Sequence, residues 1–190
     1  MIGVNDAFRF GDWVDICFFG DDKWYWWNYD DLKTFSGLKI TCDRQRNPAK
    51  VPEGDKLFGS VKNEPGIKIV KHSNAYGICT ENSKVFFNSS SGAAAINLAW
   101  WLGAKRIILV GYDMRLIDGE RNWRRHKNWQ PGPQKEYNNF LRPFKCIARD
   151  AKRLKLEILN ATPDSGLKHF PFVSLESLCK LWTSTAPSNI

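Results

Sequence analysis

Short apolar runs alternate along this chain with longer segments whose apolar residues recur at helical spacing. The short runs predict strands at residues 1–4, 14–19, 38–41, 67–71, 85–87, 106–111 and 156–159. The helical spacing predicts helices at residues 23–35, 93–102, 135–154 and 174–182. Pro143 is expected to bend the third of these or to mark its true start, and Ser174 is the expected cap of the last. Strands that alternate with helices indicate an α/β fold, with a mostly parallel sheet flanked by helices.

Residues 85–113 carry the most informative pattern, VFFNSSSGAAAINLAWWLGAKRIILVGYD. A Ser-rich turn leads into a helix that is apolar on nearly all sides, and Gly103 is its expected stop. A β-branched strand follows and ends in Gly-Tyr-Asp at Asp113. The N-terminus of such a helix offers N–H donors and a partial positive charge, which suit a phosphate or another anion. The alternative is that Ser90 or Ser91 only caps the helix.

The length of 190 residues and the hydrophobic content of 43% predict a single globular domain, which we place at residues 1–182. Pro, Gly and charged residues dominate residues 43–66, and this composition predicts an excursion from the core. Residues 183–190 are expected to form a flexible tail.

Nine Trp residues and a formal net charge of +8 set this chain apart from an average globular protein. A basic excess points to an anionic partner such as a nucleotide, a nucleic acid or an anionic glycan. A merely basic surface is the alternative. The aromatic run at residues 24–27 is expected to pack on the sheet, with any surplus rings at a homo-oligomer contact.

The five cysteines are scattered and form no CxxC motif, so we expect reduced thiols, several of them in the core. The N-terminus lacks the basic and apolar regions of a signal peptide. No stretch is long and apolar enough to cross a bilayer as a helix. These features predict a cytoplasmic protein without a membrane partner.

Small polar residues follow the predicted strands. Ligands of open parallel sheets bind beyond the carboxyl ends of the strands, so these residues are candidates for nucleotide binding. They are Asn5, Asp21, Asp22, Ser90, Ser91, Gly92, Asp113 and Asn160. Asp22, with Asp21 and Asp113, is also a candidate ligand for Mg²⁺ bound to a diphosphate. Helix capping is the alternative role for Asp21 or Asp22, and ordinary turns are rich in the same residue types.

A basic and aromatic loop follows Asp113. It contains Arg115, Arg121, Trp123, Arg124, Arg125, His126 and Trp129. Guanidinium groups bind phosphate with two parallel hydrogen bonds and Trp stacks on bases, so Arg124 and Arg125 are expected to hold a nucleotide phosphate or a nucleic acid. The neighbouring cations favour a neutral His126, which can accept a proton from a hydroxyl. A solvated surface histidine is the alternative.

Two segments resemble one Rossmann-like superfamily. They are IGVNDAFRFGDWVDICFFGDDKWYWW at residues 2–27 and SSSGAAAINLAWWLGAKRIILVGYDM at residues 89–114. The superfamily includes bacterial sialyltransferases of the lipooligosaccharide type, motility accessory factors, archaeal 6-hydroxymethylpterin pyrophosphokinases and many phage proteins. The phage members are also similar around His126 and at residues 159–171, LNATPDSGLKHFP. The resemblance covers most of the chain and implies a Rossmann-like fold and the cytoplasm of a phage host.

In the sialyltransferase branch, an Asn after the early strand and a Ser-Gly turn contact the nucleotide. The resemblance therefore assigns nucleotide binding to Asn5, Ser90, Ser91 and Gly92, and the role of general base to His126. Members usually begin with an additional strand and a Gly-Pro-Ser-type phosphate loop, and this sequence shows neither ahead of Asn5. That departure leaves transferase activity open even where nucleotide binding is kept.

Two functions follow from these patterns. The first is a transferase that moves a sugar or a pyrophosphoryl group from a nucleotide or nucleotide-sugar to a hydroxyl acceptor, with modified phage DNA among the acceptors. His126 and Asp113 are its candidate catalytic residues, and Mg²⁺ is its candidate cofactor, since the pyrophosphokinases need a metal and the sialyltransferases do not. The second is a non-catalytic phage protein that binds a nucleotide or nucleic acid, or that serves in assembly.

Overall fold

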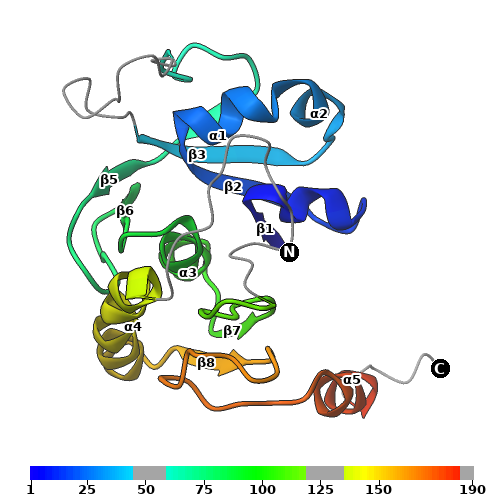
Figure 1. Cartoon of the computed structure of the whole chain (residues 1–190), viewed down its shortest axis with the longest axis vertical. Helices are drawn as coiled ribbons and strands as arrows, with labels where there is room; N and C mark the ends of the chain where they lie inside the picture. Colours follow the sequence, from blue (N-terminus) through cyan, green and yellow to red (C-terminus); the bar gives the residue numbers. More distant parts are fainter. Residues whose placement is uncertain (45–58, 119–134, 185–190) are drawn as a thin grey trace. The chain divides into compact units, whose positions relative to one another are not determined.

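The computed structural model describes residues 1–44, 59–118 and 135–184. The contacts of the chain group into two compact units, Met1–Gly103 and Ala104–Ile190. Both units have an α/β architecture in which the paired strands of the described residues run parallel (Figure 1). This confirms the predicted Rossmann-like fold class, a mostly parallel arrangement of strands flanked by helices.

The first unit contains a four-stranded parallel sheet in the order β1-β2-β3-β4. Its strands are β1 (Ile2–Val4), β2 (Ile16–Asp21), β3 (Leu38–Arg44) and β4 (Ile67–Ile69). Ile16 on β2 pairs with Ile2 on β1 and with Leu38 on β3. A 3₁₀ helix, η1 (Asn5–Phe10), connects β1 to β2, and the helices α1 (Asp22–Trp27) and α2 (Tyr29–Thr34) connect β2 to β3.

The two faces of this sheet bury different clusters, because successive side chains of a strand point to opposite faces. Phe18 on β2 packs with residues of the helix α3 (Ser91–Trp101), whereas Cys17 and Phe19 pack with η1, α1 and α2. Figure 1 shows α1 and α2 on one side of the sheet and α3 on the other. Burial raises the pKa of the Cys17 thiol to about 12. Trp24 lies against Phe19, so the predicted packing of the aromatic run on the sheet is confirmed for this residue.

The single helix predicted at residues 23–35 is instead two short helices that meet at Asn28. The Nδ2 of Asn28 donates to the carbonyl of Trp24 at 2.8 Å, and its Oδ1 accepts from Arg9 at 2.7 Å. Arg9 also pairs with Asp31 on α2 and lies over the Phe8 ring. Asn28, which is 2% exposed, thus ends α1 by a hydrogen bond to the last turn of that helix. This is an effect of tertiary packing, which the helical periodicity of the sequence cannot predict.

A second small sheet leads into α3. Its parallel strands are β5 (Lys71–Ser73) and β6 (Lys84–Phe86). Asn97, on the buried side of α3, accepts the N–H groups of Cys79 and Phe86 through Oδ1, at 2.8 and 2.9 Å. This fully buried amide therefore joins α3 to β6 and to the loop that contains Cys79.

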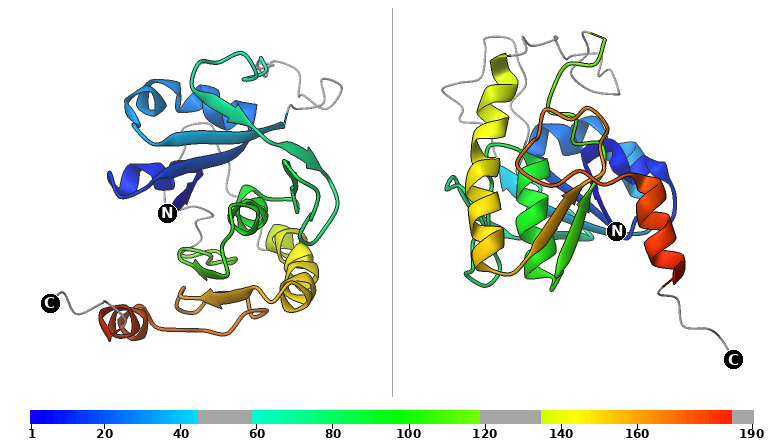
Figure 2. Two further views of the ribbon diagram at one scale, coloured as in Figure 1. Left: turned by 180° about the vertical axis from the view of Figure 1, so that it is seen from behind. Right: turned by 90° about the horizontal axis from the view of Figure 1, so that it is seen from below.

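The second unit is built on the parallel pair β7 (Arg106–Leu109) and β8 (Glu157–Asn160), joined by the long helix α4 (Lys135–Arg153). Figure 2 shows the two strands side by side. α4 buries Phe144, Ile147 and Ala151 and continues through Pro143, so Pro143 does not mark its start. The last helix, α5 (Leu175–Ser184), is preceded by Ser174 as its N-cap. The Ser174 hydroxyl accepts the N–H of Ser177, as predicted for a cap.

The predicted excursion at residues 43–66 lies partly in the core. Asp43 is buried and accepts hydrogen bonds from the Ser60 hydroxyl at 2.7 Å and from the Val61 N–H at 3.0 Å. Val61 itself is fully buried in the cluster beneath α1. Asp43 and Val61 therefore belong to the core of the first unit, while residues 45–58 lie outside the described part of the chain, as do 185–190 of the predicted tail.

All five cysteines are free thiols, and Cys17, Cys42 and Cys79 are buried in the core, as predicted. Within residues 1–44, 59–118 and 135–184, no helix has the length and apolar character needed to span a bilayer.

Candidate functional site

The candidate site of the first unit lies where β2 ends and α3 begins. A Cβ atom on Gly20 would come within 2.4 Å of the Phe87 ring and 2.8 Å of the Ser91 Oγ. The first residue of α3 is therefore in close contact with the end of β2, and α3 also contacts β1. Only a residue without a side chain permits this approach, which brings the predicted Ser turn to the predicted carboxyl edge of the sheet.

Ser90 and Ser91 have different roles. Ser90 is the N-cap: its Oγ accepts the N–H of Ala93 at 3.2 Å, and its carbonyl accepts the first helical hydrogen bond, from Ala94, at 3.0 Å. Ser91 is the first helical residue and is 7% exposed. Its hydroxyl makes no hydrogen bond to the described part of the chain. The capping role thus belongs to Ser90, and Ser91 keeps a hydroxyl for a ligand.

The turn before α3 depends on Asn88, a residue that sequence reasoning missed. Asn88 and Ser89 both have left-handed backbone conformations, with φ of 57° and 62°. The fully buried Asn88 amide accepts the N–H of Gly77 at 2.8 Å and donates to the carbonyls of Gly77 and Phe86. Asn tolerates the left-handed region better than most residues, so a lone Asn between an apolar strand and a Ser run was the available signal.

Asn5 follows β1 at the same edge. Its backbone is left-handed, with φ of 52°, and its carbonyl accepts the Cys17 thiol at 3.8 Å. Because Cys17 lies on β2, this contact attaches the turn after β1 to the neighbouring strand. The side-chain amide of Asn5 is half-buried and makes no hydrogen bond to residues within the described ranges.

Asp21 and Asp22 span the junction of β2 and α1. Asp21 is exposed and makes no capping hydrogen bond, whereas the Oδ1 of the buried Asp22 accepts the N–H of Lys23 at 2.7 Å. Among the described residues, no group of three or more His, Cys, Asp and Glu side chains could hold a metal ion. These two carboxylates fit Mg²⁺ only as a partial ligand set, with waters and substrate phosphates supplying the remaining oxygens.

Asn160 and Asp113 occupy the corresponding edge of the second unit. The Asn160 amide is buried and engaged, because Oδ1 accepts the Thr162 N–H at 3.1 Å and Nδ2 donates to the Leu167 carbonyl at 3.2 Å. The Asp113 carbonyl accepts the N–H of Gly166 at 2.7 Å. The Asp113 carboxylate makes no hydrogen bond within residues 104–118 and 135–184, so of the two side chains it is the one open to a ligand.

Further bonds join the loops after β7 and β8. The Ser165 hydroxyl donates to the Tyr112 carbonyl at 2.5 Å, and Arg115 donates to the Asp164 carbonyl at 2.8 Å. The motif at residues 159–171 therefore organises the loops of the second unit. Arg115 is tied to this framework, whereas the predicted site residues Arg124, Arg125 and His126 lie outside the described residues.

An open pocket of about 220 Å³ lies in the second unit between the end of α4, β8 and the chain at residues 169–171. Most of its lining is aliphatic or aromatic, and Lys152, Glu157 and His169 stand among the lining residues. None of the predicted site residues lines it.

Comparison of the chain with protein-family models, with curated proteins and with solved structures finds no match. The resemblance of residues 2–27 and 89–114 to a transferase superfamily therefore stays a prediction. The chemistry of the site is inferred from its geometry.

Proposed function

We propose that the first unit binds the phosphate-bearing part of a nucleotide or nucleotide-sugar at the edge formed by Asn5, Ser91 and Gly92. The observation that carries this proposal is the Ser91 hydroxyl, which lies at the N-terminus of a buried helix, against the end of β2, without a partner in the described chain. A hydroxyl at a helix N-terminus complements the partial positive charge and the N–H groups that attract phosphate.

The reaction that we propose is transfer of a sugar or pyrophosphoryl group to a hydroxyl acceptor. The acceptor oxygen forms a bond to the transferred carbon or phosphorus while the bond to the leaving phosphate oxygen breaks. His126 takes the proton of the hydroxyl, and Arg124 and Arg125 neutralise the leaving phosphate. Asp21 and Asp22 would supply carboxylates to Mg²⁺ where a diphosphate brings the ion, and Asp113 remains a candidate catalytic carboxylate.

A pair of neighbouring substitutions tests the binding site. Ser91→Ala removes a hydroxyl that makes no hydrogen bond in the described chain, so the free protein should keep its stability while its thermal stabilisation by nucleotides is lost. Ser90→Ala removes the cap, so the free protein should lose about 1 kcal/mol. The measurement is the melting temperature with a panel of nucleotides and nucleotide-sugars, with and without Mg²⁺. Stabilisation that is unchanged in Ser91→Ala would contradict the site.

The transferase step is tested separately by His126→Ala. We expect this variant to lose turnover while it is still stabilised by the donor. The non-catalytic alternative predicts donor binding without turnover in the unaltered chain. It is favoured by one observation, the concentration of the net positive charge in residues 104–190.

A further inference from the structure

The net charge of the protein belongs to the second unit. Residues 1–103 contain 12 Lys and Arg and 12 Asp and Glu, whereas residues 104–190 contain 16 and 8. The formal charge of +8 therefore lies entirely in residues 104–190. A charge that is confined to one unit creates a local field, which attracts a polyanion more strongly than the same charge spread over the chain.

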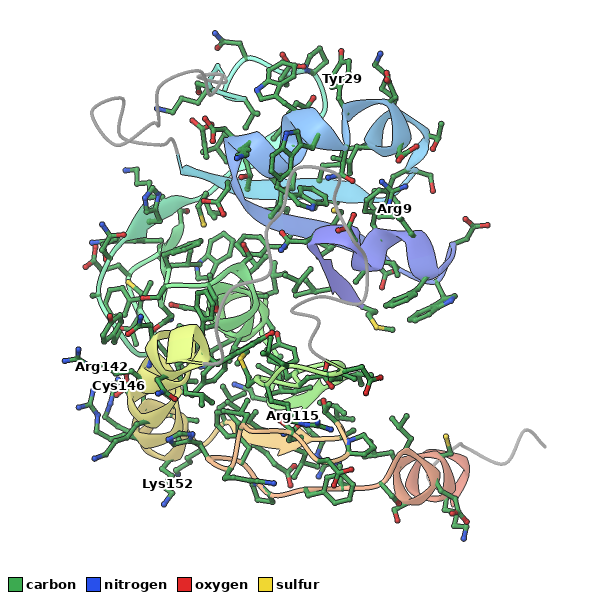
Figure 3. The ribbon with its side chains drawn as sticks, viewed as in Figure 1. Arg9, Tyr29, Arg115, Arg142, Cys146 and Lys152 are labelled. Carbon is green, nitrogen blue, oxygen red and sulfur yellow. The ribbon has the colours of Figure 1, made fainter. Side chains whose placement is uncertain are left out.

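The helix α4 concentrates this charge on its exposed side. Every exposed position from Tyr137 to Arg153 is Asn or basic. These positions are Asn138, Asn139, Arg142, Lys145, Arg149, Lys152 and Arg153. Arg142 and Lys152 extend outward from the helix in Figure 3. A solvated helix surface usually mixes both signs of charge, and from Tyr137 to Arg153 this one presents no exposed acid.

Four of these cations form a stripe. Arg142, Lys145, Arg149 and Lys152 are spaced three, four and three residues apart, which places them on one side of the helix. Successive members are separated by about 5 Å along the helix axis. Lys145 and Lys152 make no ion pair within the described residues, and Asp150 of α4 is buried against Arg149 and Arg153.

The stripe does not have the character of a membrane anchor. An interfacial helix inserts its apolar side into the lipid, but the apolar side of α4 is occupied by the core of its own unit. Phe144 and Ile147 are fully buried, and Ala151 is 5% exposed. A regular row of cations without exposed apolar residues matches a regular row of phosphates.

The pocket of about 220 Å³ adjoins this stripe. Lys152 belongs to both, and Ala148 and Ala151 of α4 form part of the pocket wall. His169 also lines the pocket and is exposed. An aliphatic and aromatic pocket beside a phosphate-binding stripe can hold a base, but only a base that is not stacked in a duplex.

We propose that α4 binds the phosphate backbone of a single-stranded nucleic acid along Arg142, Lys145, Arg149 and Lys152, with a base in the adjoining pocket. This surface is separate from the nucleotide site proposed for the first unit. Its affinity is electrostatic and largely independent of base sequence.

The test is fluorescence anisotropy with a labelled 20-nucleotide strand, alone and annealed to its complement. Four phosphate contacts predict that the logarithm of affinity falls with the logarithm of salt with a slope of about −2.8 for the single strand. The triple variant Lys145→Gln, Arg149→Gln, Lys152→Gln should reduce that slope by about 2 and the affinity about 100-fold at 0.1 M salt.

The matched control removes three exposed cations of the first unit, in the triple variant Lys33→Gln, Lys68→Gln, Lys71→Gln. It changes the total charge equally but leaves the stripe on α4 intact, so it should alter the affinity no more than about twofold. Equal loss in both triple variants would overturn the assignment to α4. Circular dichroism and the melting temperature of each variant establish that it is folded.

His169→Ala should lower the single-strand affinity about tenfold. Tighter binding of the duplex, or no effect of His169→Ala, would overturn the base pocket. Binding of heparin or of anionic vesicles with equal affinity would overturn the nucleic-acid assignment. Ser91→Ala should leave strand binding unchanged, so failure of either proposal is recognised independently of the other.

Discussion

The two units of this protein use polar side chains at the carboxyl edge of their parallel strands in different ways. In the first unit, Asn97 and Asn88 fix the backbone around α3, and the Ser91 hydroxyl remains available. In the second unit, Thr162 and Ser165 join two loops, and the Asn160 amide is engaged within one of them. The first unit is also neutral, while the second carries the whole net charge. The proposed nucleotide site therefore depends on the geometry of the first unit, and the proposed polyanion surface depends on the charge of the second.

The largest expected effect is on Asn97. Asn97→Ala leaves the buried N–H groups of Cys79 and Phe86 without their acceptor, so we expect a loss of about 3 to 5 kcal/mol in the free energy of unfolding. Urea unfolding measures this loss. The exposed Asn82→Ala is the control and should change stability by less than about 0.5 kcal/mol. If Asn97→Ala changes the free energy of unfolding as little as Asn82→Ala does, the hydrogen bonds of Asn97 do not hold α3 in place.

Asn160→Ala is the matching change in the second unit. It removes one acceptor and one donor of the loop, so we expect a loss of about 2 kcal/mol. Hydrogen exchange should show reduced protection of the Thr162 amide, whose N–H loses its acceptor. Nucleotide stabilisation should survive, because Asn160 is engaged in the loop. If nucleotide binding disappears while the loop amides stay protected, Asn160 contacts the ligand and the contrast between the units is wrong.

Two glycines sharpen the comparison. Gly20→Ala would press against the Phe87 ring and the Ser91 hydroxyl, and Gly166→Ala would press against the Met114 carbonyl at 2.7 Å. Both should lose about 1 to 3 kcal/mol of stability, as overpacked sites do. Only Gly20→Ala should also abolish nucleotide stabilisation in a thermal shift assay. Equal retention of nucleotide binding in both variants would place the ligand elsewhere.

The smallest effect concerns Cys17 and is confined to high pH. Burial raises the pKa of its thiol to about 12, from an ordinary value of 9.0. A raised pKa in the folded state means that the stabilising contribution is complete below pH 9 and is lost as the pH rises from about 9 to 12. Cys17→Ala should therefore show a shallower loss of stability in this range than the unaltered protein. Cys179→Ala, at an exposed position, is the control. Parallel curves for Cys17→Ala and the unaltered protein would contradict the assignment.

The elements that the sequence predicted well are those whose signal is local. The strand at residues 106–111, the cap at Ser174 and the stop at Gly103 depend on neighbours within about four residues. Gly103 has a φ of 96°, as a left-handed helix stop requires. The prediction of a single helix at residues 23–35 was wrong because Asn28 is held by Arg9, a residue 19 positions away.

The sequence by itself determined that this chain alternates parallel strands with helices, that it is basic, and that small polar residues follow the strands. Only the tertiary structure decided which of those polar side chains form hydrogen bonds within the protein. It assigned the cap to Ser90, left the Ser91 hydroxyl beside Gly20, and enclosed the Asn160 amide in a loop. The physical reason is that periodicity and capping are set by adjacent residues, whereas the partners of a buried polar group come from distant parts of the chain.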